Sequence, residues 1–184
     1  MRHLDDAARA TPGLDARFRA TYQSLYSSVR RYVVRLLGGD AAHADDITQE
    51  TFTKLWRETS AGREPRSERA WIFRAATNAA INASKSRRRR AELDLVVQAE
   101  FARQRTSVDV ERAAVRRDIV QRALARVPDP MRQCLLLYHE GLTGKEIALV
   151  IGVAPSYVGT LVVRAHDRFR QEVAAQGGTD DLLR

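Results

Sequence analysis

The segment LTGKEIALVIGVAPSYVGTLVVRAHDRF, residues 142–169, carries the strongest structural signal in the chain. Thr143 and Glu146 have the spacing of a capping box, in which a hydroxyl and a carboxylate satisfy backbone N–H groups at a helix start. The short helix that follows is expected to end at Gly152, because glycine readily adopts the left-handed turn that closes a helix. Pro155 suits the first position of a second helix. The segment therefore predicts two helices joined by a short turn, a helix-turn-helix.

The second helix of this pair is predicted to be amphipathic. Its apolar face is a stripe of residues at helical spacing, Val158, Val162, Ala165 and Phe169. Leu161 lies three residues after Val158 and is expected to widen this stripe. The opposite face carries Ser156, Tyr157, Gly159, Thr160, Val163 and Arg164. A helix with one face on its domain and the other face exposed is the arrangement that enters a DNA groove.

Helical periodicity also dominates the chain before this segment, and strand signals are nearly absent. An apolar stripe over residues 18–36 predicts a first helix, which Gly38 helps to end. Asp40 is expected to cap the next helix. Residues 60–67 have the composition of a loop, and a third helix is predicted at about residues 67–86.

A second group of helices is predicted from about residue 111. Its first helix is marked by an apolar stripe, Val115, Ile119, Ala123 and Val127. Pro128 breaks this helix, Asp129 is expected to cap the next one, and Pro130 is expected to open it. Gly141 is expected to end that helix, directly before the helix-turn-helix.

The expected fold is therefore all-α, with two small helical domains joined by a flexible linker. The predicted boundaries are an N-terminal extension at 1–14, a first domain at 15–90, a linker at 91–110, a second domain at 111–175 and a disordered tail at 176–184. The linker is assigned from its composition, since it is rich in alanine, glutamine, glutamate and arginine and lacks clean periodicity.

The formal net charge of +8 favours a polyanionic partner. Lysine occurs only at Lys54, Lys85 and Lys145, so part of the basic excess reflects a bias toward arginine. No apolar run is long enough to cross a membrane, and the N-terminus lacks the apolar stretch of a signal peptide. We therefore expect a cytoplasmic protein without membrane insertion.

Catalysis and metal binding have little support in the residues. Cys134 is the only cysteine, which excludes an internal disulfide, and its apolar neighbours favour a buried packing role. The histidines are scattered, at His3, His43, His139 and His166. Neither a metal-ligand spacing, nor a glycine-rich phosphate loop, nor a catalytic constellation is present. We expect no enzyme activity, no catalytic residues, no metal and no cofactor.

Two blocks of the first domain carry a family resemblance. The first runs Asp45-Asp46-Ile47-Thr48-Gln49-Glu50-Thr51-Phe52 and continues to Leu55-Trp56, and the second runs Ala70-Trp71-Ile72-Phe73-Arg74-Ala75-Ala76-Thr77-Asn78. A basic run, a linker and the helix-turn-helix follow in order. Over roughly residues 18–172, this arrangement resembles bacterial RNA polymerase sigma factors of the extracytoplasmic-function group, with sigma regions two and four. The resemblance implies a protein that binds core RNA polymerase, recognises the minus-ten and minus-thirty-five promoter elements and helps to open the duplex.

The first block is expected to bind the polymerase. Its polar residues, many of them on one helical face, are Asp45, Asp46, Gln49, Glu50 and Thr53. From the pattern alone, a solvated face with acids near a helix N-terminus is the favoured explanation. The resemblance implies instead that this face docks on the clamp helices of the β′ subunit, with Asp46, Gln49 and Glu50 at the centre. It also implies a contact between the second domain and the β flap.

The second block and the basic run are expected to bind minus-ten DNA. Trp71 is expected to pack in the core, whereas Asn78 is unfavourable in a helix unless its side chain makes a bond. The resemblance implies that Asn78 reads a flipped minus-ten base in a pocket walled by the loop at residues 60–68. That loop lacks an aromatic residue, so Arg63 and Arg66 are the candidates for stacking. The other residues assigned to this surface are Arg74, Asn82, Lys85, Arg87, Arg88, Arg89 and Arg90. The alternative for the basic run is a solvated helix end, but its clustering favours phosphate contacts.

The residues assigned to minus-thirty-five DNA are Thr143, Lys145, Ser156, Tyr157, Gly159, Thr160, Arg164 and Arg168. Many relatives carry a basic residue at the position of Gly159, an arginine at that of Leu161, and polar or basic residues at those of Val163 and His166. The surface made by Gly159, Leu161 and Val163 is therefore also a candidate for a protein partner.

Three functions stay open at this stage. The first is a promoter-specificity subunit of RNA polymerase. The second is a free-standing helix-turn-helix regulator that binds operators as a dimer, and the third is a sigma-like protein-interaction module without promoter activity. The resemblance also implies an anti-sigma factor as a partner, and a loose linker would let the two domains change their relative placement.

Overall fold

The computed structural model describes residues 12–93 and 108–177 of the chain. Within these ranges every regular element is an α-helix, which confirms the predicted fold class. The helices are α1 (Pro12–Leu36), α2 (Ala41–Ser60), α3 (Glu68–Leu93), α4 (Val108–Arg126), α5 (Met131–His139), α6 (Gly144–Ile151) and α7 (Pro155–Ala174). Most of the predicted linker, the start of the predicted N-terminal extension and most of the predicted tail lie outside the described residues.

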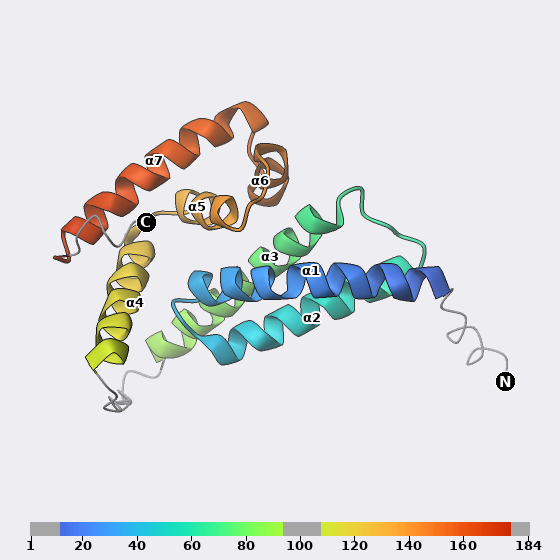
Figure 1. Ribbon diagram of the computed structural model, residues 1–184, viewed down its shortest axis with the longest axis horizontal. Coiled ribbons are helices and arrows are strands. Elements are labelled where there is room, and N and C mark those ends of the chain that lie inside the picture. Colours follow the sequence, from blue (N-terminus) through green and yellow to red (C-terminus); the bar gives the residue numbers. More distant parts are fainter. Residues whose placement is uncertain (1–11, 94–107, 178–184) are drawn as a thin grey trace.

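The first domain consists of α1, α2 and α3, which pack on one another in every pairing (Figure 1). Its core contains Tyr32, Phe52 and Phe73, all at most 1% exposed. The Tyr32 hydroxyl lies 2.8 Å from Thr77 Oγ1, so the only polar atom of this buried ring has a partner. Asp40 caps α2 as predicted, with its carboxylate accepting from the His43 N–H at 3.1 Å.

The second domain consists of α4 to α7, with α7 packing along both α4 and α5 (Figure 1). The predicted capping box is confirmed: the Thr143 hydroxyl accepts from the Glu146 N–H, and the Glu146 carboxylate accepts from the Thr143 N–H. Gly152 has a φ of 75°, the left-handed conformation expected at the end of α6, and Pro155 opens α7. The helix-turn-helix is therefore present as α6 and α7.

Several predicted details of these helices were wrong. Asp129 does not cap α5; Pro130 occupies the N-cap position, and the Asp129 carboxylate accepts instead from Arg132 Nη2 at 3.0 Å. Val115 is 52% exposed, so it does not belong to the buried stripe of α4. The helices also extend past the predicted limits: α1 begins at Pro12, α3 continues to Leu93, and α4 begins at Val108.

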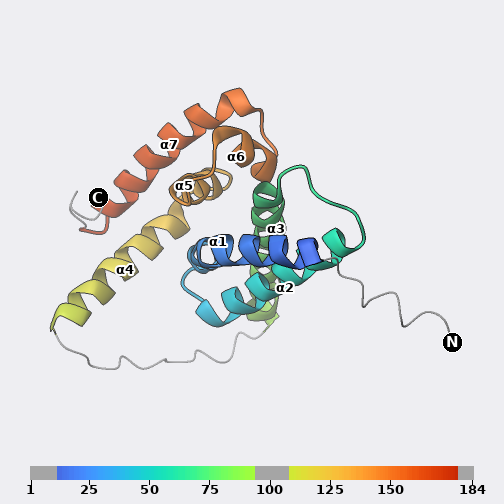
Figure 2. The same cartoon turned by 45° about the vertical axis from the view of Figure 1, so that its right-hand side comes forward.

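The two domains lie against each other. Helix α1 packs on α5, and α3 packs on α6, so that a single cluster of buried residues includes side chains of both domains (Figure 2). We call this the closed arrangement. It brings the start of α3 next to the helix-turn-helix, which no local pattern in the sequence predicts.

Two further predictions concern the packing of Cys134 and the insertion of helices into a membrane. Cys134 is fully buried, and burial raises the pKa of its thiol to about 11, which agrees with the predicted packing role. Within the described residues, no single helix has the length and hydropathy of a membrane span, although α6 and α7 reach them together across a 90° bend.

Replacing Thr143 with alanine should lower the free energy of unfolding by about 1 kcal/mol, because the N–H groups at the start of α6 lose their cap. Urea denaturation followed by circular dichroism measures this change. Thr160→Ala is the matched control, since Thr160 is exposed in the middle of α7. Equal losses in both variants would show that the capping box does not stabilise the domain.

Candidate nucleic-acid interface

Helix α3 carries one polar and basic stripe along its exposed side. Its members are spaced three or four residues apart and are all exposed: Arg74, Asn78, Asn82, Lys85 and Arg89. The opposite side of α3, with Ile72, Phe73 and Ala76, is buried in the first domain. Because residues at this spacing share one helix face, the stripe is a continuous surface that can run along a nucleic-acid strand.

The basic run at the end of α3 is partly engaged within the chain. Arg87 pairs with Asp40 through Nη1 and Oδ2 at 2.6 Å, which ties the end of α3 to the start of α2. The backbone N–H of His43 is the main reason why the pKa of Asp40 lies below its usual value, and Arg87 adds to this effect. Arg88 and Arg90 are helical, but their side chains lie outside the described set.

The loop between α2 and α3 presents two exposed arginines, one of which is paired within the chain. Arg63 donates to the Glu58 carboxylate from Nε at 2.7 Å and from Nη2 at 3.1 Å. These bonds raise the pKa of Arg63 and lower that of Glu58. Arg66 is exposed. An exposed ion pair contributes little to stability, so Arg63 can exchange Glu58 for another acceptor at little cost.

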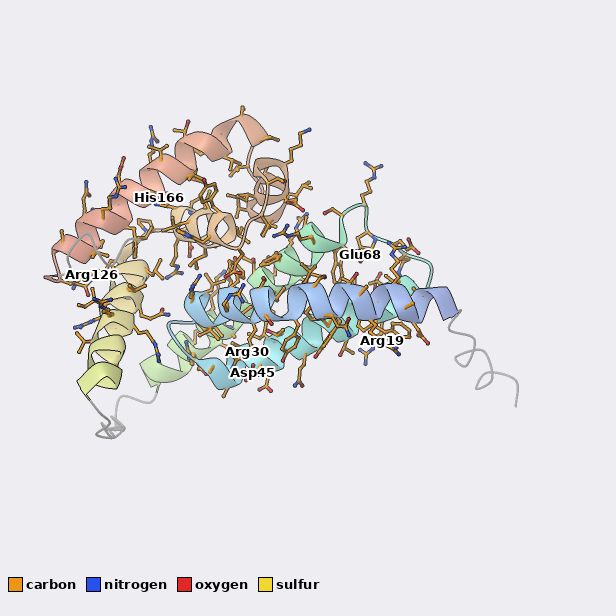
Figure 3. The ribbon with its side chains drawn as sticks, in the orientation of Figure 1. Arg19, Arg30, Asp45, Glu68, Arg126 and His166 are labelled. Atoms are coloured by element: carbon orange, nitrogen blue, oxygen red, sulfur yellow. The ribbon has the colours of Figure 1, made fainter. Side chains whose placement is uncertain are left out.

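The acidic face of α2 is exposed as predicted at Asp46, Gln49, Glu50 and Thr53. Asp45 is different, because its carboxylate is held by Arg30 of α1, with Nε and Oδ1 2.5 Å apart (Figure 3). The hydrogen bond from Arg30 holds the pKa of Asp45 below its usual value. Asp45 therefore faces α1, whereas the other four side chains face outward, and Glu50 pairs with Lys54 one turn along α2 at 2.8 Å.

An aromatic groove adjoins this acidic face, and the sequence analysis missed it. A cavity of about 580 Å³ lies between α1 and α2, lined by the rings of Phe18, Tyr22, Phe52 and Trp56, with Thr53 on its rim. The Phe18 and Trp56 rings meet edge to face, with centroids 5.0 Å apart. The spacing of Phe18 and Tyr22 was visible in the sequence, but it indicated only a buried stripe.

The exposed face of α7 is as predicted. Ser156, Tyr157, Thr160 and Arg164 are all exposed, and Leu161 is 1% exposed, which confirms that it widens the buried stripe. A Cβ atom added to Gly159 would meet no heavy atom within 4 Å, so packing inside the chain does not require glycine there.

The remaining residues assigned to this surface differ in availability. Lys145 is exposed. The Thr143 hydroxyl is held by Glu146, with which it shares a 2.8 Å hydrogen bond. Arg168 pairs with Glu172 one turn along α7, at 2.6 Å. Lys145 is therefore more readily available to DNA than Thr143 and Arg168.

A buried carboxylate joins the two domains, and nothing in the sequence pattern indicated it. The Glu140 side chain is 2% exposed and pairs with Arg31 at 2.9 Å and with Arg35 at 3.4 Å, both on α1. Arg69 of α3 donates to the Glu140 backbone carbonyl at 2.7 Å. Three arginines of the first domain thus converge on one residue of the second.

Two histidines that are distant in the sequence meet in the second domain. The His139 and His166 rings lie 5.5 Å apart, and Tyr138 packs near both. Partial burial, followed by the charge on His166, lowers the pKa of His139. Among the described residues, this pair has no third histidine, cysteine or carboxylate placed to complete a metal site.

Comparisons with known proteins cover both domains. The model for sigma-70 region 2 matches residues 21–90, and the model for sigma-70 region 4 matches residues 117–167. The chain is 33% identical over 168 residues to the ECF RNA polymerase sigma factor SigL of Mycobacterium tuberculosis, covering 90% of each chain. It is 31% identical over 156 residues to the RNA polymerase sigma-H factor of Pseudomonas aeruginosa, covering 76% of this chain and 80% of the other.

Two solved structures share the fold. One is the sigma factor RpoE of Bartonella quintana in complex with the anti-sigma factor NepR, with a TM-score of 0.64, 20% identity and coverage of 85% of this chain and 96% of that one. The other is CnrH in complex with the cytosolic domain of CnrY, with a TM-score of 0.65, 21% identity and coverage of 92% and 96%.

Proposed function

We propose that the exposed surfaces of this chain bind either core RNA polymerase or promoter DNA, because the chain belongs to the extracytoplasmic-function group of RNA polymerase sigma factors. The protein is a sigma factor that directs transcription initiation. The observation that carries this conclusion is the 33% identity to a sigma factor over 90% of both chains, which includes both domains. This relationship favours a promoter-specificity subunit over a free-standing operator-binding regulator. The proposed role requires no catalysis by the chain itself. The protein is proposed to act in the cytoplasm, where the polymerase acts.

Run-off transcription with core polymerase tests this function. Purified protein added to sigma-free polymerase should produce transcripts with defined starts from a subset of a promoter library. A protein that neither associates with core polymerase nor selects a start site would exclude a role as a sigma factor.

The polymerase-binding surface is proposed to be the acidic face of α2 together with the adjoining aromatic groove. Asp46, Gln49 and Glu50 are exposed and supply charge complementarity to a basic partner. The groove beside Thr53 offers aromatic rings, the kind of side chain that dominates the energy of protein interfaces. The β′ clamp helices are the proposed occupant of this surface, and the β flap is the proposed partner of the second domain.

The minus-ten strand is proposed to follow the exposed stripe of α3. Lys85 and Arg89 are suited to phosphate contacts, whereas Asn78 offers an amide that can pair with the edge of a base. Asn78 is exposed in the middle of a helix, where asparagine lowers helix stability without a local benefit. This placement supports a role for Asn78 in reading a base.

Asn78→Ala should lower initiation about tenfold from the promoter that carries the preferred base at one minus-ten position. Initiation from promoters with the other bases at that position should stay nearly unchanged, because contacts to base edges carry sequence information and contacts to phosphates do not. Initiation from four promoters that differ at a single minus-ten position measures this preference. Lys85→Ala is the matched comparison on the same stripe and should weaken all four promoters equally. If Asn78→Ala weakened initiation from all four promoters equally, Asn78 would not be the residue that reads this base.

The minus-thirty-five element is proposed to bind the exposed face of α7, with Ser156, Tyr157 and Thr160 toward the groove and Arg164 toward phosphate. The N-terminal residues of a recognition helix are those that normally meet base edges. Lys145 at the start of α6 is proposed to contact the adjacent phosphates.

The closed arrangement is proposed to be incompatible with binding both elements at once. The two elements, about 25 base pairs apart by their names, are separated by roughly 85 Å of B-DNA at about 3.4 Å per base pair. The longest described helix has 26 residues, which corresponds to about 39 Å. Two domains of this size in direct contact cannot span the promoter, so they must separate.

An anti-sigma factor is proposed to hold the two domains together. One solved structure with the same fold is a sigma factor in complex with an anti-sigma factor, and another is CnrH in complex with the cytosolic domain of CnrY, which supports this proposal. A partner that binds both domains in contact would favour the closed arrangement by mass action.

A further inference from the structure

The loop between α2 and α3, residues 61–67, has little main-chain support at its centre. It arches from the end of α2, beside the start of α1, to the start of α3 (Figure 1, Figure 2). The N–H group of Arg63 donates to a carbonyl of α2 at 2.9 Å. Among the described residues, no hydrogen bond involves the N–H group of Glu64 or Arg66, and Pro65 has no N–H group. The main chain therefore does not by itself fix the centre of this loop.

One arginine of α1 ties the loop to the rest of the domain. Arg17 donates from Nη1 to the Glu64 carboxylate at 2.7 Å, and its Nη2 lies 2.5 Å from Oε1 of Glu68, the first residue of α3. The Thr21 hydroxyl, one turn further along α1, donates to the other carboxylate oxygen of Glu68 at 2.7 Å. One guanidinium group thus joins the loop to α1 and to the start of α3.

These contacts form a network and not an isolated surface pair. The side chains of Arg17 and Glu64 are each 49% exposed, but that of Glu68 is only 18% exposed and has two partners on α1. An isolated exposed ion pair contributes little to stability, whereas a network of well-oriented charges contributes more. The network has only to order a short loop, so its effect is expected in the placement of the loop and not in global unfolding.

We propose that Arg17 is a positioning residue, which holds the α2–α3 loop in place for the reading of a minus-ten base. Arg66, the exposed arginine assigned to stacking on that base, follows Glu64 by two residues. A pocket wall that is already ordered loses less free energy when the flipped base enters. Arg17 acts through Glu64 and Glu68, which occupy its guanidinium group. This inference rests on the proposed minus-ten function and deepens it.

A nitroxide label in the loop tests the positioning without polymerase or DNA. Arg66→Cys provides the attachment site, because Cys134 is fully buried and its thiol has a raised pKa. Adding Arg17→Ala should shorten the rotational correlation time of the label about twofold, as measured by electron paramagnetic resonance. Arg122→Ala is the matched control, since it also removes an exposed arginine that pairs with a carboxylate, that of Asp118 on α4. The control should leave the mobility of the label unchanged.

Initiation from four promoters that differ at a single minus-ten position tests the consequence, with Arg66 intact. Arg17→Ala should lower initiation from the promoter with the preferred base about threefold more than from the other three, because the wall is less often in place when the base enters. Adding Glu64→Gln to Arg17→Ala should not lower the preference further, since the two residues act through one contact. Arg122→Ala should leave the preference unchanged.

Three results would overturn this inference. Unchanged mobility of the label in Arg17→Ala would show that other contacts hold the loop. Equal weakening of all four promoters would show that Arg17 supplies only general attraction to DNA. A further loss of preference on adding Glu64→Gln would show that the two residues act independently.

The proposed function fails separately. A wild-type chain that selects no start site with sigma-free polymerase would overturn the proposed function and this inference together. Normal selection by the wild-type chain, with an unchanged base preference in Arg17→Ala, would overturn this inference alone.

Discussion

Replacing Glu140 with lysine is expected to separate the two domains and to raise the affinity for promoter DNA. The substitution removes the buried carboxylate that Arg31 and Arg35 share and places a third positive charge between them. Breaking a buried charge pair typically costs about 3–5 kcal/mol, and the partial exposure of these two arginines lowers the expected effect to roughly 1–2 kcal/mol. A shift of this size changes the ratio of open to closed molecules by about tenfold.

Small-angle scattering, which reports the radius of gyration, measures the opening, and fluorescence anisotropy with a promoter duplex measures the affinity. Glu58→Lys is the control, because Glu58 pairs with Arg63 inside the first domain. It should leave the domain separation unchanged. Because it adds the same charge and releases Arg63, the effect of opening is the part of the affinity gain by which Glu140→Lys exceeds Glu58→Lys. An unchanged radius in a folded Glu140→Lys protein would mean that the apolar contacts alone hold the domains together.

The double substitution Asp46→Lys with Glu50→Lys should abolish association with core polymerase. Both side chains are exposed on one face of α2, one helical turn apart, so the change reverses the charge of that face without disturbing the core. Interface hot spots contribute about 2–4 kcal/mol each, which predicts a loss in affinity of at least about a hundredfold. Co-elution with core polymerase on a sizing column and a binding titration measure this loss.

The same Glu58→Lys variant controls for added positive charge on α2, since Glu58 is not part of the proposed face. Circular dichroism should show unchanged helix content for all variants. Affinity of the double variant within about twofold of the unmodified chain would place the polymerase contact elsewhere, with the aromatic groove beside Thr53 as the next surface to test.

Local signals in the sequence predicted the helix-turn-helix in detail. The capping box, the left-handed Gly152 and the opening Pro155 all depend on atoms within a few residues, so their spacing in the sequence is sufficient to predict them. The wrong assignments, Asp129 as a cap and Val115 as buried, have different origins, since the first involves a contact three residues along the chain and the second the packing of a whole helix. Arg132 engages Asp129, and the packing of α4 leaves Val115 exposed.

The candidate surfaces were predictable to different degrees. The exposed stripe of α3 and the acidic face of α2 each lie on one helix, and helical periodicity brings their residues together. The aromatic groove needs α1 beside α2, so the sequence indicated its rings only as part of a buried stripe.

The sequence by itself determined the helices, the caps of α2 and α6 and the exposed polar faces, because these depend on bonds and spacings within one or two turns of the chain. Only the tertiary structure decided that Glu140 meets arginines 109, 105 and 71 positions away, and that Arg17 meets Glu64 at a separation of 47 positions. Such contacts are set by how helix faces pack. The residues that form them carry no mark of their distant partners in the local pattern.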